Sequence, residues 1–337
     1  MNKSSLFLFI ALLFAFSCNE KKKEAKKTAS FYYWKQHFKL SPTQKKLLSD
    51  LNCKKIHVKF FDLKWDESSN KAIPAAKITF ENVPKLNIIP CIFIENQVFK
   101  KNKESDLANL THQLIQEISK KNKISYNEIQ FDCDWTKNTR EKYFTFLKKI
   151  KQKLNKNQII SATIRLHQYK YPNRTGIPPI KKGVLMCYNM GKIENIHSKN
   201  SIISPEVLKS YLTGKTPYPI KLDLALPIYK WGLIFRFGKL IHIINDVQDP
   251  SSNKNFKNLG NGKFKAITSF YFQETYINKG EVLKVEKSTP ENISICSKIL
   301  AKSKHKFGNL VFYHLSHESI KNYNAKFFTK ILSIFNQ

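Results

Sequence analysis

Eight short segments rich in β-branched and aromatic residues recur along the chain, and helical patterns or polar connections separate most of them. Such an alternation predicts an α/β protein, in which parallel strands form the core and helices cover it. Eight strands in this order fit a (β/α)8 TIM barrel, whose functional groups lie where the strands end. The strand predictions are residues 31–34, 55–61, 88–94, 128–134, 159–166, 183–189, 222–229 and 309–314.

The connections contain helical patterns with recognisable starts. Residues 41–51 and 204–212 each begin with serine and proline, and this pair favours a helix N-terminus because the serine side chain caps the first turn. The other helix predictions are residues 106–120, 139–154, 290–301 and 320–335. A doubly wound open sheet is the competing fold, but no glycine-rich phosphate loop supports it and the chain contains only 10 glycines.

The alternation of predicted strands and helices is interrupted after the seventh strand. Residues 234–241 predict a hairpin, and residues 264–272 and 282–285 predict further strands. We therefore expect a single barrel over residues 31–337, with a β-rich insertion at residues 232–287 that covers or extends a cleft. The remaining length of about 305 residues is normal for one barrel with insertions.

The N-terminal segment has the composition of an export signal. Lys3 supplies positive charge, and residues 6–16 are apolar but too few to span a bilayer. Residues 15–18, Ala-Phe-Ser-Cys, resemble the lipobox of bacterial lipoproteins. The resemblance implies a signal peptide over residues 1–17, a lipidated Cys18 and a flexible tether over residues 18–30. The alternative is a plain secretory signal, in which Cys18 has no such role.

A lipid anchor would place the protein in the cell envelope without a membrane-spanning helix. Asn19 stands where an aspartate would retain a lipoprotein at the inner membrane, so we expect the outer membrane, at its periplasmic face or at the cell surface. Of the 6 cysteines, those other than Cys18 form an odd-numbered set without paired spacing, which argues against a disulfide framework.

The formal net charge of +33 does not by itself indicate a nucleic-acid partner. Lysines are scattered over every segment, arginine is scarce, and no compact basic motif with groove-reading chemistry is present. The charge adds at most a secondary attraction to anionic lipid surfaces. His57 and His167 have no partner at metal-ligand spacing, so we expect no metal and no cofactor. We also expect the protein to be a monomer.

Residues 128–136, Glu-Ile-Gln-Phe-Asp-Cys-Asp-Trp-Thr, give the strongest indication of function. Asp132 and Asp134 lie two positions apart on the fourth predicted strand, so their side chains point to the same face. If that face is the barrel interior, two carboxylates meet at the C-terminal end of the strand. Burying a carboxylate is costly unless it is hydrogen-bonded or used in chemistry. The alternative is a strand that ends in solvent, with an aspartate beginning the loop.

Residues 132–135, Asp-Cys-Asp-Trp, resemble the DxDxE strand of the family-eighteen chitinase-like glycosidases, and residues 186–189, Met-Cys-Tyr-Asn, resemble their Met-x-Tyr-Asp. Residues 31–314 are also similar to a group of bacterial barrel proteins classed as a domain of unknown function, with a QxDxD fourth strand and a MxYxMG sixth strand. The residues that match this second pattern are Gln130, Asp132, Asp134, Tyr188, Met190 and Gly191. The resemblance to the chitinase-like glycosidases implies a carbohydrate or glycan ligand, with Trp231 as an aromatic floor for a sugar ring.

The sequence departs from the chitinase pattern at the general acid, because Thr136 stands where that pattern has glutamate. A hydroxyl cannot protonate a glycosidic oxygen at neutral pH as a carboxylic acid with a raised pKa does. A glycosidase mechanism uses two carboxyl groups about 5 to 9 Å apart. If hydrolysis is retained, the acid must come from another carboxyl at a predicted strand end: Asp62, Asp66, Glu95 or Asp134 itself.

Aromatic and polar residues at other strand ends complete the predicted site. Trp34, Tyr188 and Trp231 would line a cleft suited to the apolar faces of sugars. Arg165, on the fifth strand, would pair with one of the two aspartates and favour its charged form. The predicted catalytic residues are Asp132, Asp134 and Glu95, and the predicted substrate-binding residues are Trp34, Asp62, Arg165, Tyr188, Asn189 and Trp231.

Glycan hydrolysis at the C-terminal face of the barrel is the leading hypothesis from the sequence. One alternative is a non-catalytic glycan-binding lipoprotein, in which Thr136 marks lost chemistry. Another is an envelope scaffold, in which side chains such as Trp135 and Phe61 fill the cleft.

Overall fold

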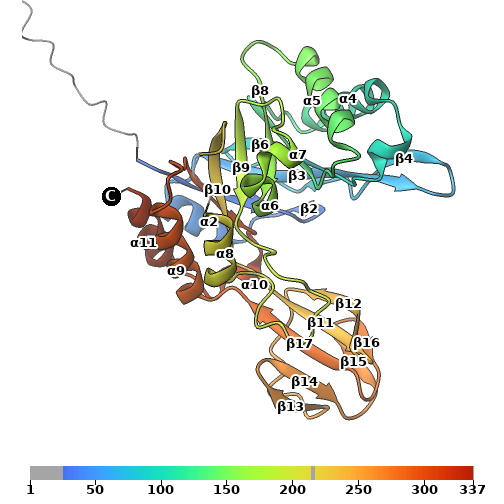
Figure 1. The fold of residues 1–337 in the computed structure, drawn as a ribbon, viewed down its shortest axis with the longest axis vertical. Helices are drawn as coiled ribbons and strands as arrows, with labels where there is room; N and C mark the ends of the chain where they lie inside the picture. Colours follow the sequence, from blue (N-terminus) through green and yellow to red (C-terminus); the bar gives the residue numbers. More distant parts are fainter. Residues whose placement is uncertain (1–25, 214–216, 337) are drawn as a thin grey trace, which may run out of the picture.

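The computed structural model describes residues 26–213 and 217–336, so Cys18 and the predicted signal peptide lie outside the described residues. Eight parallel strands close into a barrel in the order β1-β18-β10-β9-β8-β7-β6-β3, because β1 also pairs with β3 (Figure 1). These strands are β1 Ala29–Tyr33, β3 Lys55–Asp66, β6 Asn87–Ile94, β7 Glu128–Cys133, β8 Ile159–Arg165, β9 Lys182–Met186, β10 Lys221–Pro227 and β18 Leu310–Tyr313. The predicted TIM barrel is therefore confirmed, strand by strand.

β3 runs past its predicted end, for a reason that lies outside its own sequence. A short strand, β4 Lys71–Ala75, folds back antiparallel on the second half of β3, from Asp62 to Asp66. The added pairing keeps the backbone extended beyond the rim of the barrel. A smaller parallel pair, β2 His37–Phe38 with β5 Thr79–Phe80, contacts β3 before this extension, where Phe80 lies edge-on to Phe60 at 6.1 Å.

The helices cover the outside of the barrel, and most begin where their caps predict. Ser41 closes a capping box on the first of them: its hydroxyl accepts from Gln44 N at 3.2 Å, and Gln44 Oε1 accepts from Ser41 N at 2.8 Å. The longer helices are α2 Pro42–Asp50, α4 Glu104–Lys121, α5 Arg140–Lys153, α9 Pro290–Ala301 and α11 Ala325–Phe335; the shorter ones are α3 Val98–Lys101, α6 Leu166–Lys170, α7 Pro172–Thr175, α8 Pro205–Tyr211 and α10 His317–Ile320.

The last predicted helix begins five residues later than expected, at Ala325 instead of Ile320, and a short helix precedes it. α10 ends at Ile320, and Asn324 then caps α11 by accepting a hydrogen bond from Phe327 N at 2.9 Å. Among the described residues, no helix is both long and apolar enough to cross a bilayer.

The β-rich insertion follows the seventh barrel strand, as predicted. Five antiparallel strands form a sheet in the order β12-β11-β17-β14-β13, and a separate hairpin, β15–β16, lies beside it. Their bounds are β11 Lys230–Arg236, β12 Lys239–Asn245, β13 Phe256–Gly260, β14 Lys263–Ala266, β15 Phe270–Phe272, β16 Thr275–Ile277 and β17 Val282–Lys287. The insertion has an apolar cluster of its own, which includes Ile234, Phe256, Phe264 and Leu283. It projects away from the helices α4 and α5 in Figure 1.

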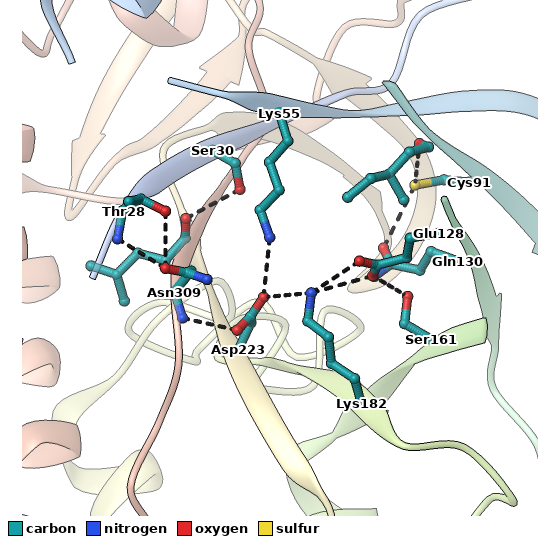
Figure 2. Close-up of polar contacts among 12 residues, drawn as sticks. Thr28, Ser30, Lys55, Cys91, Glu128, Gln130, Ser161, Lys182, Asp223 and Asn309 are labelled. Carbon is teal, nitrogen blue, oxygen red and sulfur yellow. Dashed lines mark hydrogen bonds and ion pairs between the residues drawn. The ribbon is translucent and has the colours of Figure 1, made fainter. Parts of the chain in front are cut away.

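Four charged side chains, of which Asp223 is buried and the others are half-buried, close the N-terminal end of the barrel (Figure 2). Asp223 on β10 lies between two lysines: its Oδ2 is 3.0 Å from Lys182 Nζ and 3.5 Å from Lys55 Nζ. Lys182 also reaches Glu128 Oε2 at 3.1 Å, and Asn309 N donates to Asp223 Oδ1 at 2.8 Å. Two cations and two anions thus neutralise one another across β3, β7, β9 and β10, at the end of the barrel opposite to the predicted site.

Candidate functional site

A cavity of about 490 Å³ opens at the C-terminal ends of the barrel strands. Its size lies within the usual range for a small-ligand site, and its position is where TIM barrels place their functional groups. The structure brings seven of the predicted site residues to its lining: Trp34, Asp62, Asp132, Arg165, Tyr188, Asn189 and Trp231. Trp135 and Phe61 do not line it, so they leave it open.

Asp132 lies next to the end of β7 and is 9% exposed. Burial raises the pKa of its carboxyl group from 3.8 to about 6, and the negative charge of Asp134 acts in the same direction. A hydrogen bond from Thr163 Oγ1, at 2.6 Å, and the positive charge of Arg165 oppose this rise in pKa. A carboxyl group with a pKa near neutrality is well suited to give up and take up a proton.

The raised pKa of Asp132 predicts a pH-dependent effect on stability that needs no ligand. Above about pH 6 the fold must hold a charged carboxylate that burial disfavours, whereas below about pH 4 the group is neutral in both the folded and unfolded states. We therefore expect Asp132→Asn to melt at a higher temperature than the wild type at pH 8, and the difference to vanish toward pH 4. Thermal melts across this range check it; a difference independent of pH would contradict the assigned pKa.

Asp62 is the second carboxyl group of the cavity. Phe93 on β6 is in register with Asp62 on β3 and with Asp132 on β7, so the two aspartates lie at one level, two strands apart. Strand spacing then separates their Cα atoms by about 10 Å, and side chains that point into a closed barrel converge from there. Lys59 Nζ lies 3.1 Å from Asp62 Oδ1 and 3.2 Å from Oδ2, and both side chains are buried. The cavity therefore contains two carboxyl groups, Asp62 and Asp132, and Asp62 is paired with Lys59.

Asp134 is held outside this cavity by Arg165. The guanidinium donates from Nε and Nη2 to the two carboxylate oxygens, a bidentate pairing that fixes both groups. The pair borders a second cavity of about 340 Å³, which shares Arg165, Tyr188 and Asn189 with the first. Asp134 and Arg165 are therefore held in place at the border of the second cavity, where they can bind a ligand.

Tyrosine and tryptophan rings form the walls of the main cavity. Tyr188 stacks on Tyr313 with ring centroids 5.1 Å apart, and Trp34 meets Tyr313 edge-on at 5.8 Å. Tyr229 donates from its hydroxyl to Asn189 Oδ1 at 2.5 Å. Rings held in this way offer rigid apolar surfaces with polar atoms between them, which suits the faces and hydroxyls of a sugar.

Three further residues singled out from the sequence lie outside the main cavity. Glu95 is not in the cavity lining: the chain turns after β6 ends, and Glu95 Oε2 accepts a hydrogen bond from Trp65 N at 3.2 Å. Thr136 borders the second cavity and shapes the start of α5, where its backbone N–H donates to Thr139 Oγ1 at 3.0 Å. Trp135 packs outside the barrel, stacked on Tyr143 of α5 at 5.3 Å.

Several lining residues were absent from the predicted site, among them Lys59, Asp246, Tyr313 and His314. Tyr313 and His314 could have been predicted, because they end the eighth predicted strand and functional groups of a TIM barrel lie at strand ends. Burial lowers the pKa of His314 to about 4, so its imidazole is neutral at pH 7. A neutral imidazole can donate a hydrogen bond to a ligand from one ring nitrogen and accept one at the other. Asp246 follows β12 of the insertion, and no local signal places it beside the barrel.

No protein-family model and no curated protein matches this chain. Among solved structures, a chitinase from Chromobacterium violaceum is similar over 92% of this chain and 98% of its own, with 9% identity and a TM-score of 0.51. The spore cortex-lytic enzyme SleL from Bacillus megaterium is similar over 92% of this chain and 74% of its own, with 13% identity and a TM-score of 0.51. These likenesses show that the chain has the fold of chitinase-like TIM barrels.

Proposed function

We propose that the protein hydrolyses a glycosidic bond of an envelope or extracellular glycan in the main cavity. The observation that supports this most directly is the buried Asp132, whose pKa of about 6 suits a group that protonates a leaving oxygen at neutral pH. Asp62, two strands away, provides the second carboxyl group that glycoside hydrolysis requires.

The remaining lining residues would hold the sugar in place. Trp231 and Tyr188 present rings against which a sugar can stack, and Asn189, Arg165 and neutral His314 can bond its hydroxyls. The two cavities share one border, so a chain of several sugars could extend from one into the other. In this proposal Asp134 acts on the substrate through binding only, because Arg165 occupies both of its oxygens.

A panel of glycans tests the proposal. Purified protein is incubated with chitin oligosaccharides, peptidoglycan fragments and neutral and acidic polysaccharides, and the products are separated by chromatography and mass. We expect one class to be shortened by the wild type and left intact by Asp132→Asn. Unchanged turnover in the variant would remove Asp132 from the chemistry and overturn the proposal.

A non-catalytic glycan receptor is the second candidate function. Two observations favour it: Thr136 stands where the chitinase pattern has its acid, and Arg165 locks the neighbouring Asp134. In the same panel, saturable binding of a glycan without any shortening after long incubation would select this candidate.

We also propose that the protein is exported and held on a membrane, preferentially the outer one, by lipid on Cys18. The apolar residues 6–16, the lipobox-like residues 15–18 and the polar residues 19–28 support this proposal. The predicted tether is two residues too long, because Ala29 and Ser30 are buried in β1. The barrel would then meet glycans close to that membrane as a monomer, without a nucleic-acid partner.

Cys18→Ala is expected to abolish labelling by radioactive palmitate and to move the protein from the membrane pellet to the soluble fraction, because the acyl chains are the anchor. Cys53→Ala is the matched control, since Cys53 is a buried free thiol of the barrel domain, and it should keep the label. Unchanged labelling of Cys18→Ala would contradict the anchor.

A further inference from the structure

The insertion builds one wall of the main cavity. Trp231 on β11 is in register with Asn245 on β12 and with Glu286 on β17. Residues directly opposite one another on antiparallel strands share a face of the sheet, so these three side chains form a row. Trp231 and Asn245 line the cavity, whereas Glu286 does not.

Glu286 is the buried partner of the Trp231 indole. Its Oε2 accepts from Trp231 Nε1 at 3.0 Å and from Ser201 N at 3.0 Å, and the Ser201 hydroxyl donates to the same atom. Its Oε1 lies 2.6 Å from Lys284 Nζ, and each of these two charged side chains is 1% exposed. Lys284 Nζ also donates to Ser198 Oγ at 2.8 Å.

These contacts join the loop of residues 190–204 to β11 and β17, which are distant from it in the sequence. Ser198 and Ser201 belong to the loop of residues 190–204, which follows Tyr188 and Asn189 in the chain. The loop is closely packed: Gly191 N donates to Ser201 O at 3.0 Å, and a Cβ atom on Gly191 would lie 2.9 Å from Ser201 Cα. Glu286 therefore ties the wall that contains Tyr188 to the wall that contains Trp231.

Stability alone does not explain a buried ion pair at this place. Removing two charges from water is costly, and apolar residues of similar volume are often as stable or more stable. Leu233 on β11 lies opposite Lys284 on β17, and its side chain is apolar and fully buried. What an apolar pair cannot provide is an acceptor for the indole N–H, which fixes the orientation of the ring.

We propose that Glu286 is a positioning residue: it fixes the indole plane of Trp231 in the cavity wall, so that the ring stands ready to stack on a sugar. This inference rests on the proposed function for the role of the ring. The orientation of the ring itself can be tested without any ligand.

The main test is the double variant Lys284→Met/Glu286→Leu. Both charges are removed together, so no unpaired charge stays buried and the fold is retained. We expect KM or Kd for the glycan to rise about tenfold, because the ring is no longer held in its stacking orientation. We expect kcat to change less than about threefold, since Asp132 is untouched.

A ligand-independent readout comes from ¹⁹F NMR of protein labelled with 5-fluorotryptophan. The chain has 4 tryptophans, and Trp231→Phe identifies the resonance of Trp231. In the double variant this resonance should shift or broaden, while the other three stay in place. The variant Lys284→Met/Glu286→Gln also removes both charges but keeps a side-chain oxygen that accepts the indole N–H, and it should retain the wild-type resonance and most of the affinity.

The control is Glu281→Gln, which alters another buried carboxylate of the insertion. Glu281 is 3% exposed and bonds Arg236 Nε at 2.6 Å, but it does not line the main cavity. This variant should leave the Trp231 resonance and glycan affinity unchanged, so an equal effect of Glu281→Gln would overturn the inference.

The possible outcomes separate the inference from the proposed function. An unshifted, sharp Trp231 resonance in the folded double variant overturns the positioning role. A shifted resonance, in a protein whose wild type binds no glycan of the panel, supports the positioning role and rejects the proposed function. In a Trp231→Phe background the double substitution should not weaken glycan binding further; an additional loss would show that Glu286 acts by another route.

Discussion

Replacing Asp132 with asparagine is expected to lower kcat for glycan cleavage about a thousandfold and to leave KM within about threefold of the wild type. Asparagine has the same shape, and its amide oxygen can still accept the hydrogen bond from Thr163 Oγ1. It cannot transfer a proton, which is the task proposed for Asp132, whose pKa is raised to about 6. Initial rates over a range of substrate concentrations measure both constants.

Glu95→Gln is the matched control for this prediction. Glu95 also follows a barrel strand, but its carboxylate bonds Trp65 N outside the cavity, and glutamine can keep that contact. Its kcat should stay within about twofold of the wild type. If Glu95→Gln were inactive and Asp132→Asn fully active, the assignment of the acid would be wrong.

Asp223→Ala at the base of the barrel is expected to lower the free energy of unfolding by about 3 to 5 kcal/mol. The substitution leaves Lys55 and Lys182 facing each other without the carboxylate that separates them, and it removes the acceptor for Asn309 N (Figure 2). Burying uncompensated charge is costly, whereas the intact network is neutral. Urea unfolding at pH 7, followed by circular dichroism, measures the change.

Asp50→Ala serves as the comparison for this loss. Asp50 forms an exposed pair with Lys46 at 3.0 Å on α2, and such surface pairs contribute less than about 1 kcal/mol. A loss below about 1 kcal/mol for Asp223→Ala, similar to that for Asp50→Ala, would mean that the lysines find water or new partners. The charges at the base would then not be a stabilising element of the barrel.

The barrel could be predicted because each of its strands shows a local pattern. Buried parallel strands read as short runs of β-branched and aromatic residues, and serine caps mark the helix starts, as at Ser41. The extension of β3 could not be predicted, since it depends on antiparallel pairing with β4. The start of α11 at Ala325, and not at Ile320, depends on the cap at Asn324, which a periodic apolar pattern does not reveal.

The candidate site was predictable to the extent that strand ends define it. The two-residue spacing places Asp132 and Asp134 on one face only while the strand lasts, and β7 ends at Cys133. Beyond that point the chain turns, and Arg165 draws Asp134 away from the main cavity. Asp246 and Glu286 were missed because the insertion brings them to the barrel through contacts between distant segments, which no local pattern encodes.

A crystal structure of Asp132→Asn soaked with an oligosaccharide from the panel shows whether the cavity around Asp132 is the glycan site. We expect a sugar ring against Trp231 and a glycosidic oxygen about 2.6 to 3.2 Å from the side chain at position 132. An ordered sugar bound only elsewhere, with this cavity holding none, would contradict it.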